Sequence, residues 1–441
     1  MKNLKSTLIK SIIVILIILN GCSGDDPDSP QTIKYKASTS NFSAQVDAFI
    51  ANDNSKYYNN IKECVYRNDF YTNESCSLKD LPLLGQEYES VTADTIIERL
   101  VITDDWMLDR FQEVLEILPD DILSLFKAVT AVVIATDVRP AFYWSSTGAI
   151  YLDPKYLWMT ADEKNTIDQK EDYRKNYGND LKFKMPYRYV VNNKQVTFST
   201  DWDSNKDRTF EEMKTSLTHL LVHELAHAND FFPPTTINRI SLNQSILSAS
   251  NSIKGNRISD ILRVSYPLKS QLLKDIAGIN YRNETAKAEI FEYTSQIISE
   301  EFKNDLANDD YNYSTQYEDL AMFFEEFMMK YHFDIDRDFA VCDISNPDNI
   351  TPLTGKNYIV YWGQRNRIGK SEIKEKAKLI VEYIFPFTYE KYNEFFNNLK
   401  KPTELIAGKT WSESILIGQE KGMKSQIQIM DTEVMFKIPY L

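Results

Sequence analysis

The stretch Ser216-Leu-Thr-His-Leu-Leu-Val-His-Glu-Leu-Ala-His-Ala-Asn-Asp230 holds three of the four histidines of this 441-residue chain. Within it, His223, Glu224 and His227 form the pattern H-E-x-x-H. Residues four apart share one face of an α-helix, so both imidazoles can reach a single metal ion. Glu224 is the next residue round the helix, where a carboxylate can take a proton from a metal-activated water. The stretch therefore predicts a helix that carries two metal ligands and a general base.

Apolar residues surround the motif, which favours a helix buried within a domain. Between Leu217 and Ala228 the only ionisable side chains are the three histidines and Glu224. Burying a carboxylate without a partner is costly, and a metal ion nearby would remove that cost. The alternative is a buried helix whose histidines are only hydrogen-bonded, but such a helix has no need of Glu224 beside two histidines.

Two further polar residues lie on the same face of this helix. His219 stands one turn before His223. It cannot easily join a tetrahedral site that the next two turns already span, so we expect it to pack nearby or to hold a ligand. Asp230 extends the face toward the end of the helix, and we expect it to accept the N–H of a histidine, as metal sites usually provide.

A catalytic zinc site needs a third protein ligand and keeps one position for water. No histidine follows at a suitable spacing, but Tyr317–Met329 reads as a second apolar helix with acidic residues on one side. Glu318, in its first turn, is our candidate for the third ligand. Glu325 and Asp230 are the alternatives.

Together, the run H-E-L-A-H-A-N-D and the Glu-x-x-Ala-x-x-Phe run that begins at Glu318 resemble the gluzincin metallopeptidases. Within them, the resemblance is closest to the family of the anthrax lethal factor catalytic domain. It implies a zinc peptidase in which His223, His227 and Glu318 hold Zn²⁺ and Glu224 is the general base. It covers two helices, well under half of the chain, and argues for the reaction class rather than for a substrate.

The same family has a tyrosine seven residues before the third ligand, where it stabilises the oxyanion. That position is Tyr311 here, and Tyr313 is a neighbour that could take its place. The chain also departs from the family, because the gap from His227 to Glu318 is longer and the second helix ends differently.

The N-terminus has the pattern of a secretory signal. Three lysines precede the apolar run Ser11–Leu19, which ends at Leu-Asn-Gly-Cys22, and this ending resembles the lipobox of bacterial lipoproteins. We predict a signal peptide at 1–21, lipid attachment at Cys22 and a flexible tether at 22–33; an uncleaved anchor helix is the alternative. We therefore expect an extracytoplasmic, lipid-anchored protein at the outer membrane, on its surface or its periplasmic face.

The net charge limits the class of partner, and the cysteines indicate the redox compartment. The formal net charge of −14 disfavours nucleic acid as a partner, and we expect a peptide or protein substrate. An oxidising compartment permits a disulfide between Cys64 and Cys76. Cys342 would then be a buried, unreactive residue.

The periodicity predicts a helix-rich α+β fold, and the resemblance implies a zincin-like catalytic domain at 101–335 with a small mixed sheet. Residues 34–100 have an unclear role, apart from helical spacing near Phe42–Ala51, and 336–441 form a C-terminal α/β extension. Before the motif we expect a helix, a buried strand at 129–136 and a hairpin. The second strand of this hairpin, Gly148–Leu152, is our candidate for a sheet edge open to an extended peptide; an ordinary hairpin within a mixed sheet is the alternative. A second hairpin turns at Asn192-Asn193.

Three functions fit these observations. The first is a zinc endopeptidase, and the second is a surface lipoprotein that binds peptide or glycan on a zincin scaffold without cutting. The third is a metal-dependent hydrolase of a non-peptide amide. An intact Glu224 between two histidines favours an enzyme, because a binding protein gains nothing from the base.

Overall fold

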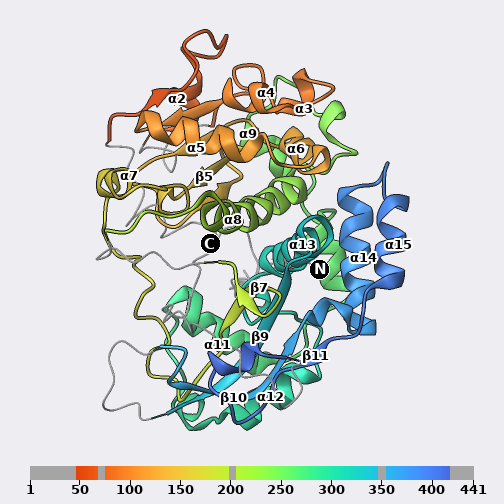
Figure 1. Cartoon of the computed structure of the whole chain (residues 1–441). Coiled ribbons are helices and arrows are strands. Elements are labelled where there is room, and N and C mark those ends of the chain that lie inside the picture. The colour runs from red at the N-terminus through yellow and green to blue at the C-terminus, as the bar shows by residue number, and fades with distance from the viewer. Residues whose placement is uncertain (1–45, 68–74, 198–204, 346–353, 418–441) are drawn as a thin grey trace, which may run out of the picture. The chain divides into compact units, whose positions relative to one another are not determined.

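The computed structural model describes residues 46–67, 75–197, 205–345 and 354–417 (Figure 1). The predicted signal peptide 1–21, Cys22 and the tether 22–33 lie outside the described residues. Within those ranges, no helix has both the length and the apolar character needed to span a membrane. The fold is α+β, with two sheets and many helices, as the periodicity predicted.

The first sheet has five strands in the order β1-β2-β3-β5-β4. The three inner strands run parallel, and both outer strands pair antiparallel to their neighbours. The strands are β1 (Phe49–Ile50), β2 (Leu100–Ile102), β3 (Val132–Ile134), β4 (Phe142–Trp144) and β5 (Ala149–Leu152).

Two predictions about this sheet were wrong. Gly148–Leu152 is not an edge, because β5 pairs with β3 on one side and with β4 on the other. All four residues of β5 are buried, which suits an inner strand, and β4 is the edge instead. The helical spacing near Phe42–Ala51 also predicted the wrong element. The described part of that stretch contains the strand β1, because its pairing with β2 overrides local propensity.

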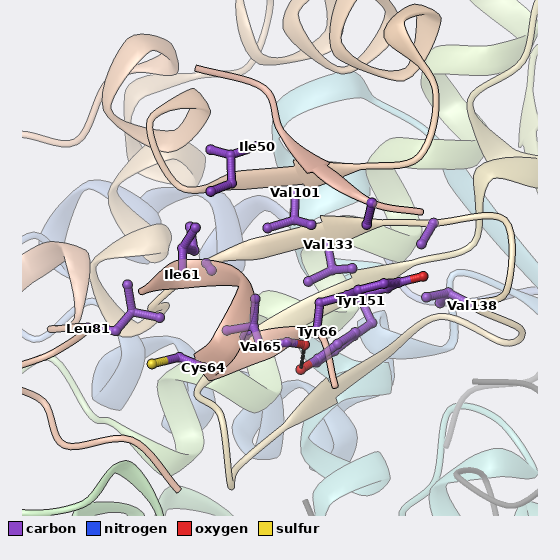
Figure 2. Packing of buried hydrophobic residues seen from close by; sticks show 14 of the residues in the cluster. Ile50, Ile61, Cys64, Val65, Tyr66, Leu81, Val101, Val133, Val138 and Tyr151 are labelled. Atoms are coloured by element: carbon purple, nitrogen blue, oxygen red, sulfur yellow. Dashed lines mark hydrogen bonds between the residues drawn. The ribbon is translucent and has the colours of Figure 1, made fainter. Parts of the chain in front are cut away.

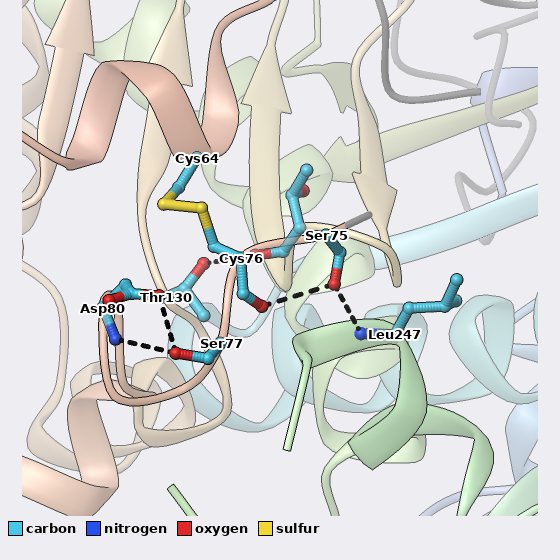
Figure 3. Close-up of a disulfide and its surroundings, with 8 residues drawn as sticks. Cys64, Ser75, Cys76, Ser77, Asp80, Thr130 and Leu247 are labelled. Atoms are coloured by element: carbon cyan, nitrogen blue, oxygen red, sulfur yellow. Dashed lines mark hydrogen bonds between the residues drawn. A yellow bond between two sulfur atoms is a disulfide. The ribbon is translucent and has the colours of Figure 1, made fainter. Parts of the chain in front are cut away.

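A hydrophobic core joins this sheet to α2 (Ile61–Val65), as Figure 2 shows. The Tyr151 hydroxyl donates a hydrogen bond of 2.8 Å to the carbonyl oxygen of Val65. Next to this core the predicted Cys64–Cys76 disulfide is present (Figure 3), and Cys342 is free and buried. The bridge ties α2 to Cys76, whose carbonyl oxygen accepts a hydrogen bond of 2.9 Å from the backbone N–H of Ile246 at the start of α9 (Ile246–Asn251).

The second sheet is antiparallel, in the order β11-β10-β9-β7-β8, with β6 beside β9. The predicted hairpin is confirmed: Asn192 and Asn193, with φ of 50° and 61°, turn the chain between β7 and β8. The strands are β6 (Phe183–Lys184), β7 (Tyr187–Val191), β8 (Lys194–Gln195), β9 (Asp336–Ile344), β10 (Tyr358–Arg365) and β11 (Thr403–Glu404).

Two long helices position the site. α8 (Phe210–Phe231) packs against β4 and β5, and α13 (Gln316–Phe333) packs against α8 and β9 (Figure 1). Each begins at a threonine N-cap, Thr209 or Thr315, whose hydroxyl accepts an N–H of the first turn. The site helices thus lie between the two sheets.

The remaining helices surround these elements. The helix expected before the motif is present as α5, and the C-terminal extension contains helices and strands as expected. The bounds are α3 (Leu84–Glu87), α4 (Ala93–Ile97), α5 (Asp105–Leu115), α6 (Asp120–Leu125), α7 (Ala161–Thr166), α9 (Ile246–Asn251), α10 (Ile258–Ser265), α11 (Gln271–Arg282), α12 (Ser295–Lys303), α14 (Ser371–Ile384) and α15 (Glu390–Asn398).

Candidate metal site

His223 and His227 of α8 and Glu318 of α13 converge on one point. The Nε2 atoms of the two histidines are 3.2 Å apart, and Glu318 Oε2 lies 2.9 Å from that of His223 and 3.4 Å from that of His227. One ligand atom from each residue lies within 4.8 Å of the others. All three side chains are buried. Two imidazoles and one carboxylate are the donor set of many catalytic zinc sites, so these residues fit the ion that the motif implies.

Glu224 lies beside this group, and no side chain of the described residues donates a hydrogen bond to its carboxylate. It is 1 % exposed, and neither carboxylate oxygen makes a hydrogen bond within the described part of the chain. Burial raises the pKa of Glu224 to about 7, although the nearby charges of His223 and His227 act in the opposite direction. A buried carboxylate left without donors is costly unless a cation lies near, which also fits a metal ion at this point.

Glu325, two turns after Glu318 in α13, contacts the Nδ1 side of the His223 ring. Its Oε2 lies 2.9 Å from His223 Nδ1, and its Oε1 lies 3.3 Å from His219 Nδ1 and accepts a hydrogen bond of 2.5 Å from the Tyr189 hydroxyl. Burial raises the pKa of Glu325, but the hydrogen bonds from His219 and His223 outweigh it and hold the pKa below its ordinary range. Glu325 therefore orients the ring of His223 and leaves Nε2 directed at Glu318.

This arrangement decides among residues that the sequence left open. Glu325 was an alternative third ligand, but it lies on the Nδ1 side of His223, away from the three-residue group. His219 contacts Glu325 and not that group, in keeping with the role expected for it. The sequence gives no signal that Tyr189 contacts Glu325, because the hairpin that carries Tyr189 meets α13 only in the tertiary fold.

The expectation for Asp230 was wrong, since its carboxylate does not hold a histidine. Its two oxygens accept hydrogen bonds from the backbone N–H of Ser259 (2.8 Å) and from the Ser259 hydroxyl (2.6 Å). Ser259 lies in the first turn of α10, where backbone N–H groups lack helical partners and compete for a nearby carboxylate. Burial raises the pKa of Asp230 to about 6. Asp230 thus joins the end of α8 to α10.

The two candidate tyrosines occupy one short turn, Tyr311–Tyr313, and lie against different surroundings. The ring of Tyr311 stacks at 6.3 Å from the ring of His223. Tyr313 packs at 6.0 Å from Phe302 instead. Tyr311 is therefore the one beside the metal-ligand candidates, and its role as an oxyanion donor stays a prediction.

A buried ion pair holds the first turn of α13. Lys376 of α14 donates to both oxygens of Asp319 at 2.7 Å, and the side-chain amide of Asn312 donates to the same carboxylate at 3.0 Å. Asn312 belongs to the turn of Tyr311, so these bonds connect that turn, Glu318 and α14. The sequence signal for Lys376 is weak but present: it lies on the apolar stripe of its helix, between Ile373 and Ala377.

Comparisons with known proteins do not assign the chain, because no family model, no curated protein and no solved structure matches it. Its function is therefore inferred from the geometry of the site.

Proposed function

We propose that this protein is a zinc metallopeptidase of the zincin type, anchored outside the cytoplasm through a lipid on Cys22. His223, His227 and Glu318 would hold Zn²⁺, which when bound polarises a water molecule and the carbonyl of the scissile bond. Glu224 takes the proton of the attacking water and delivers it to the leaving amine. Tyr311 donates a hydrogen bond to the developing oxyanion.

One observation carries the proposal: a buried carboxylate without a side-chain partner lies next to two histidines and a glutamate whose ligand atoms lie within 4.8 Å of one another. A cluster that served only stability would pair its carboxylates, as Glu325 is paired. Burial moves the pKa of Glu224 to about 7, where a carboxylate can both accept and release a proton near neutral pH.

The edge strand supports a peptide as the substrate. Among the described strands, β4 is an outer strand of the first sheet. It packs against α8, and the backbone N–H of Tyr143 lies close enough to the Glu224 carboxylate to offset part of the rise in its pKa. An extended peptide that pairs with β4 would pass beside the proposed base. This assigns to β4 the role that the sequence had suggested for Gly148–Leu152.

The location outside the cytoplasm is supported by two independent features. The N-terminal pattern that ends at Cys22 is one. The other is the Cys64–Cys76 disulfide, because such bridges persist in oxidising compartments. The proposed site is the outer membrane, with the body of the protein on the surface or in the periplasm.

Metal analysis of the full chain, purified in detergent, tests the proposal. We expect one zinc ion per chain and cleavage of an unfolded protein that stops with a chelator and returns with added zinc. Glu318→Ala should remove both the metal and the cleavage, whereas Glu300→Ala, an exposed glutamate of α12, should change neither. Absence of stoichiometric zinc would overturn the proposal and favour the non-cutting binding lipoprotein. Stoichiometric zinc without cleavage of peptide bonds would favour the metal-dependent hydrolase of a non-peptide amide.

A further inference from the structure

A pocket lies beyond Tyr311, outside the residues assigned to the metal and the base. Its walls come from three separate segments: the stretch around β6, the end of α11 and the residue before Tyr311. The polar lining consists of Lys184, Asn280, Tyr281 and Asp310, with Met185 and Gly178 beside them.

Two aromatic rings connect this pocket to the metal-ligand candidates. The ring of Tyr281, in the pocket wall, meets the ring of Tyr311 edge-on at 4.5 Å, and Tyr311 stacks at 6.3 Å from His223. Asp310, also in the wall, directly precedes Tyr311. An extended peptide advances about 3.3 Å per residue, so a few residues span a separation of two adjoining rings.

Lys184 brings a positive charge to this pocket without an ion-pair partner among the described residues. Its Nζ donates to the carbonyl oxygen of Gly178 at 3.2 Å, and the nearest acidic influence is the exposed Asp180. Burial lowers the pKa of Lys184 to about 8, which still leaves the amine largely protonated at neutral pH.

One carboxyl, that of Asp310, also lines the pocket. Asp310 is buried beside Asp309, and burial together with that neighbour raises its pKa well above the ordinary range. Its carboxyl already accepts a hydrogen bond of 2.7 Å from the Tyr281 hydroxyl, and Asp309 is ion-paired with Arg337 at 2.6 Å. Asp310 therefore opposes the charge of Lys184 less than an ordinary carboxylate would, and Lys184 is the cation of the lining.

We propose that this pocket binds a carboxylate of the substrate, with Lys184 as its cation. The carboxylate belongs to an aspartate or glutamate side chain near the cleaved bond, or to the C-terminus of the peptide. This inference rests on the proposed peptidase function and adds a specificity residue to it. The net charge of −14 supports a specific role for Lys184. An acidic protein repels acidic peptides in general, so it needs a local cation to select one.

The test compares Lys184 variants of the zinc-loaded full chain. Cleavage sites in a mixture of unfolded proteins are mapped by mass spectrometry, and matched peptides are then made with an acidic or an amide side chain and with a free or an amidated C-terminus. We expect acidic residues, or the terminal carboxylate, at one constant distance from the cut; the four peptides tell the two sources apart.

Lys184→Met should lower kcat/KM for the preferred acidic peptide by roughly tenfold or more, the effect of one charged hydrogen bond, and leave the amide peptide almost unchanged. Lys184→Arg should restore part of the preference, and Lys184→Glu should shift it toward basic residues. The matched control is Lys182→Met, since Lys182 lies two residues away, is exposed and pairs with Glu292 on the surface. Thermal melting checks that each variant folds.

Failure of the inference differs from failure of the proposed function. Cleavage without a carboxylate preference, or equal effects of Lys184→Met and Lys182→Met, would overturn the pocket assignment and leave the peptidase intact. If the zinc-loaded protein cuts nothing, calorimetric binding of acidic and amidated peptide mixtures decides the pocket by itself. Binding that depends on Lys184 would then support it, and its absence would overturn it.

Discussion

Glu224 and Glu325 are both buried and both stand beside His223, yet their surroundings are opposite. Around Glu224, no side chain of the described residues donates a hydrogen bond to the carboxylate, and burial raises its pKa to about 7. The region of α13 around Glu325 offers His219, His223 and Tyr189, and the pKa of Glu325 lies below its ordinary range.

The difference shows how one site can keep two carboxylates in different states. A carboxylate with three donors remains charged and fixes the ring it holds, whereas one without donors can exchange a proton. Burial alone does not distinguish them, because both side chains are nearly inaccessible. Their hydrogen-bond partners distinguish them, and these partners come from other elements of the fold. The following variants test this difference between the two carboxylates.

Replacing Glu224 should have the largest effect on activity. Glu224→Gln keeps the size of the side chain and removes the base, so we expect kcat to fall by about 10²- to 10⁴-fold. Zinc content should stay at the wild-type level, and the melting temperature should not fall, since a neutral amide replaces a partnerless acid. Glu211→Gln, an exposed glutamate of the same helix, is the control. An active Glu224→Gln protein would refute the mechanism.

The ion pair at the start of α13 should dominate stability. Lys376→Met leaves Asp319 buried without its cation, which costs about 3–5 kcal/mol of unfolding free energy in such settings. Urea denaturation measures this cost. Lys378→Met should change little, because the partly exposed Lys378 of the same helix pairs only with the exposed Glu375. A double variant with Asp319→Asn should recover much of the loss, and if it does not, the pair is not the cause.

Glu325→Gln should weaken metal binding rather than abolish catalysis. The variant loses the charge that orients His223, and loss of such a partner typically lowers metal affinity by about 10- to 100-fold. Competition with a chelator measures the affinity. The control is Glu326→Gln, because Glu326 is equally buried but accepts hydrogen bonds from Asn308 and from the backbone of Ile368. Equal effects of the two variants would contradict the positioning role of Glu325.

Asp121 lies outside the proposed site and, like Glu325, is a carboxylate with several hydrogen-bond donors. Its replacement should have the smallest effect of the variants considered. Burial raises its pKa, but hydrogen bonds from His332, Lys391 and Tyr392 hold it below the ordinary range. A depressed acid pKa stabilises the fold above the unfolded value, about 3.9, and this contribution is lost as the pH falls toward the folded value.

Asp121→Asn should therefore cost about 1–2 kcal/mol at pH 7. The difference from the wild type should narrow below about pH 4. Urea denaturation at the two pH values checks this. A difference that stayed constant with pH would show that Asp121 contributes through packing and not through its charge.

Much of the site could be predicted because its signals are local. His223, Glu224 and His227 lie within one helical turn, and a helix places them without help from the rest of the chain. The choice of Glu318 needed a second helix with an acid in its first turn, and the structure brings that residue to the two histidines. The hairpin at Asn192-Asn193 was equally local, because two asparagines tolerate the left-handed backbone that its turn requires.

Other predictions failed where long-range pairing or competition decides. The hairpin of β4 and β5 was placed correctly along the chain, but the sequence did not show which of its two strands pairs with β3. Burial of β5 on both sides decides this pairing. Asp230 shares a helix face with the histidines in projection, yet the unpaired N–H groups of α10 attract its carboxylate. Neither outcome has a signal in the neighbouring sequence.

By itself, the sequence determined the helix of the H-E-x-x-H motif, the spacing of its ligand atoms and the acidic helix that could complete the set. Periodicity and residue chemistry act over a few residues, and that range was enough. Only the tertiary structure decided which acid meets the histidines, which acid holds His223 from behind and which is left without donors. Those outcomes depend on packing between segments about 95 residues apart or more, where burial and competition for hydrogen bonds outweigh local preference.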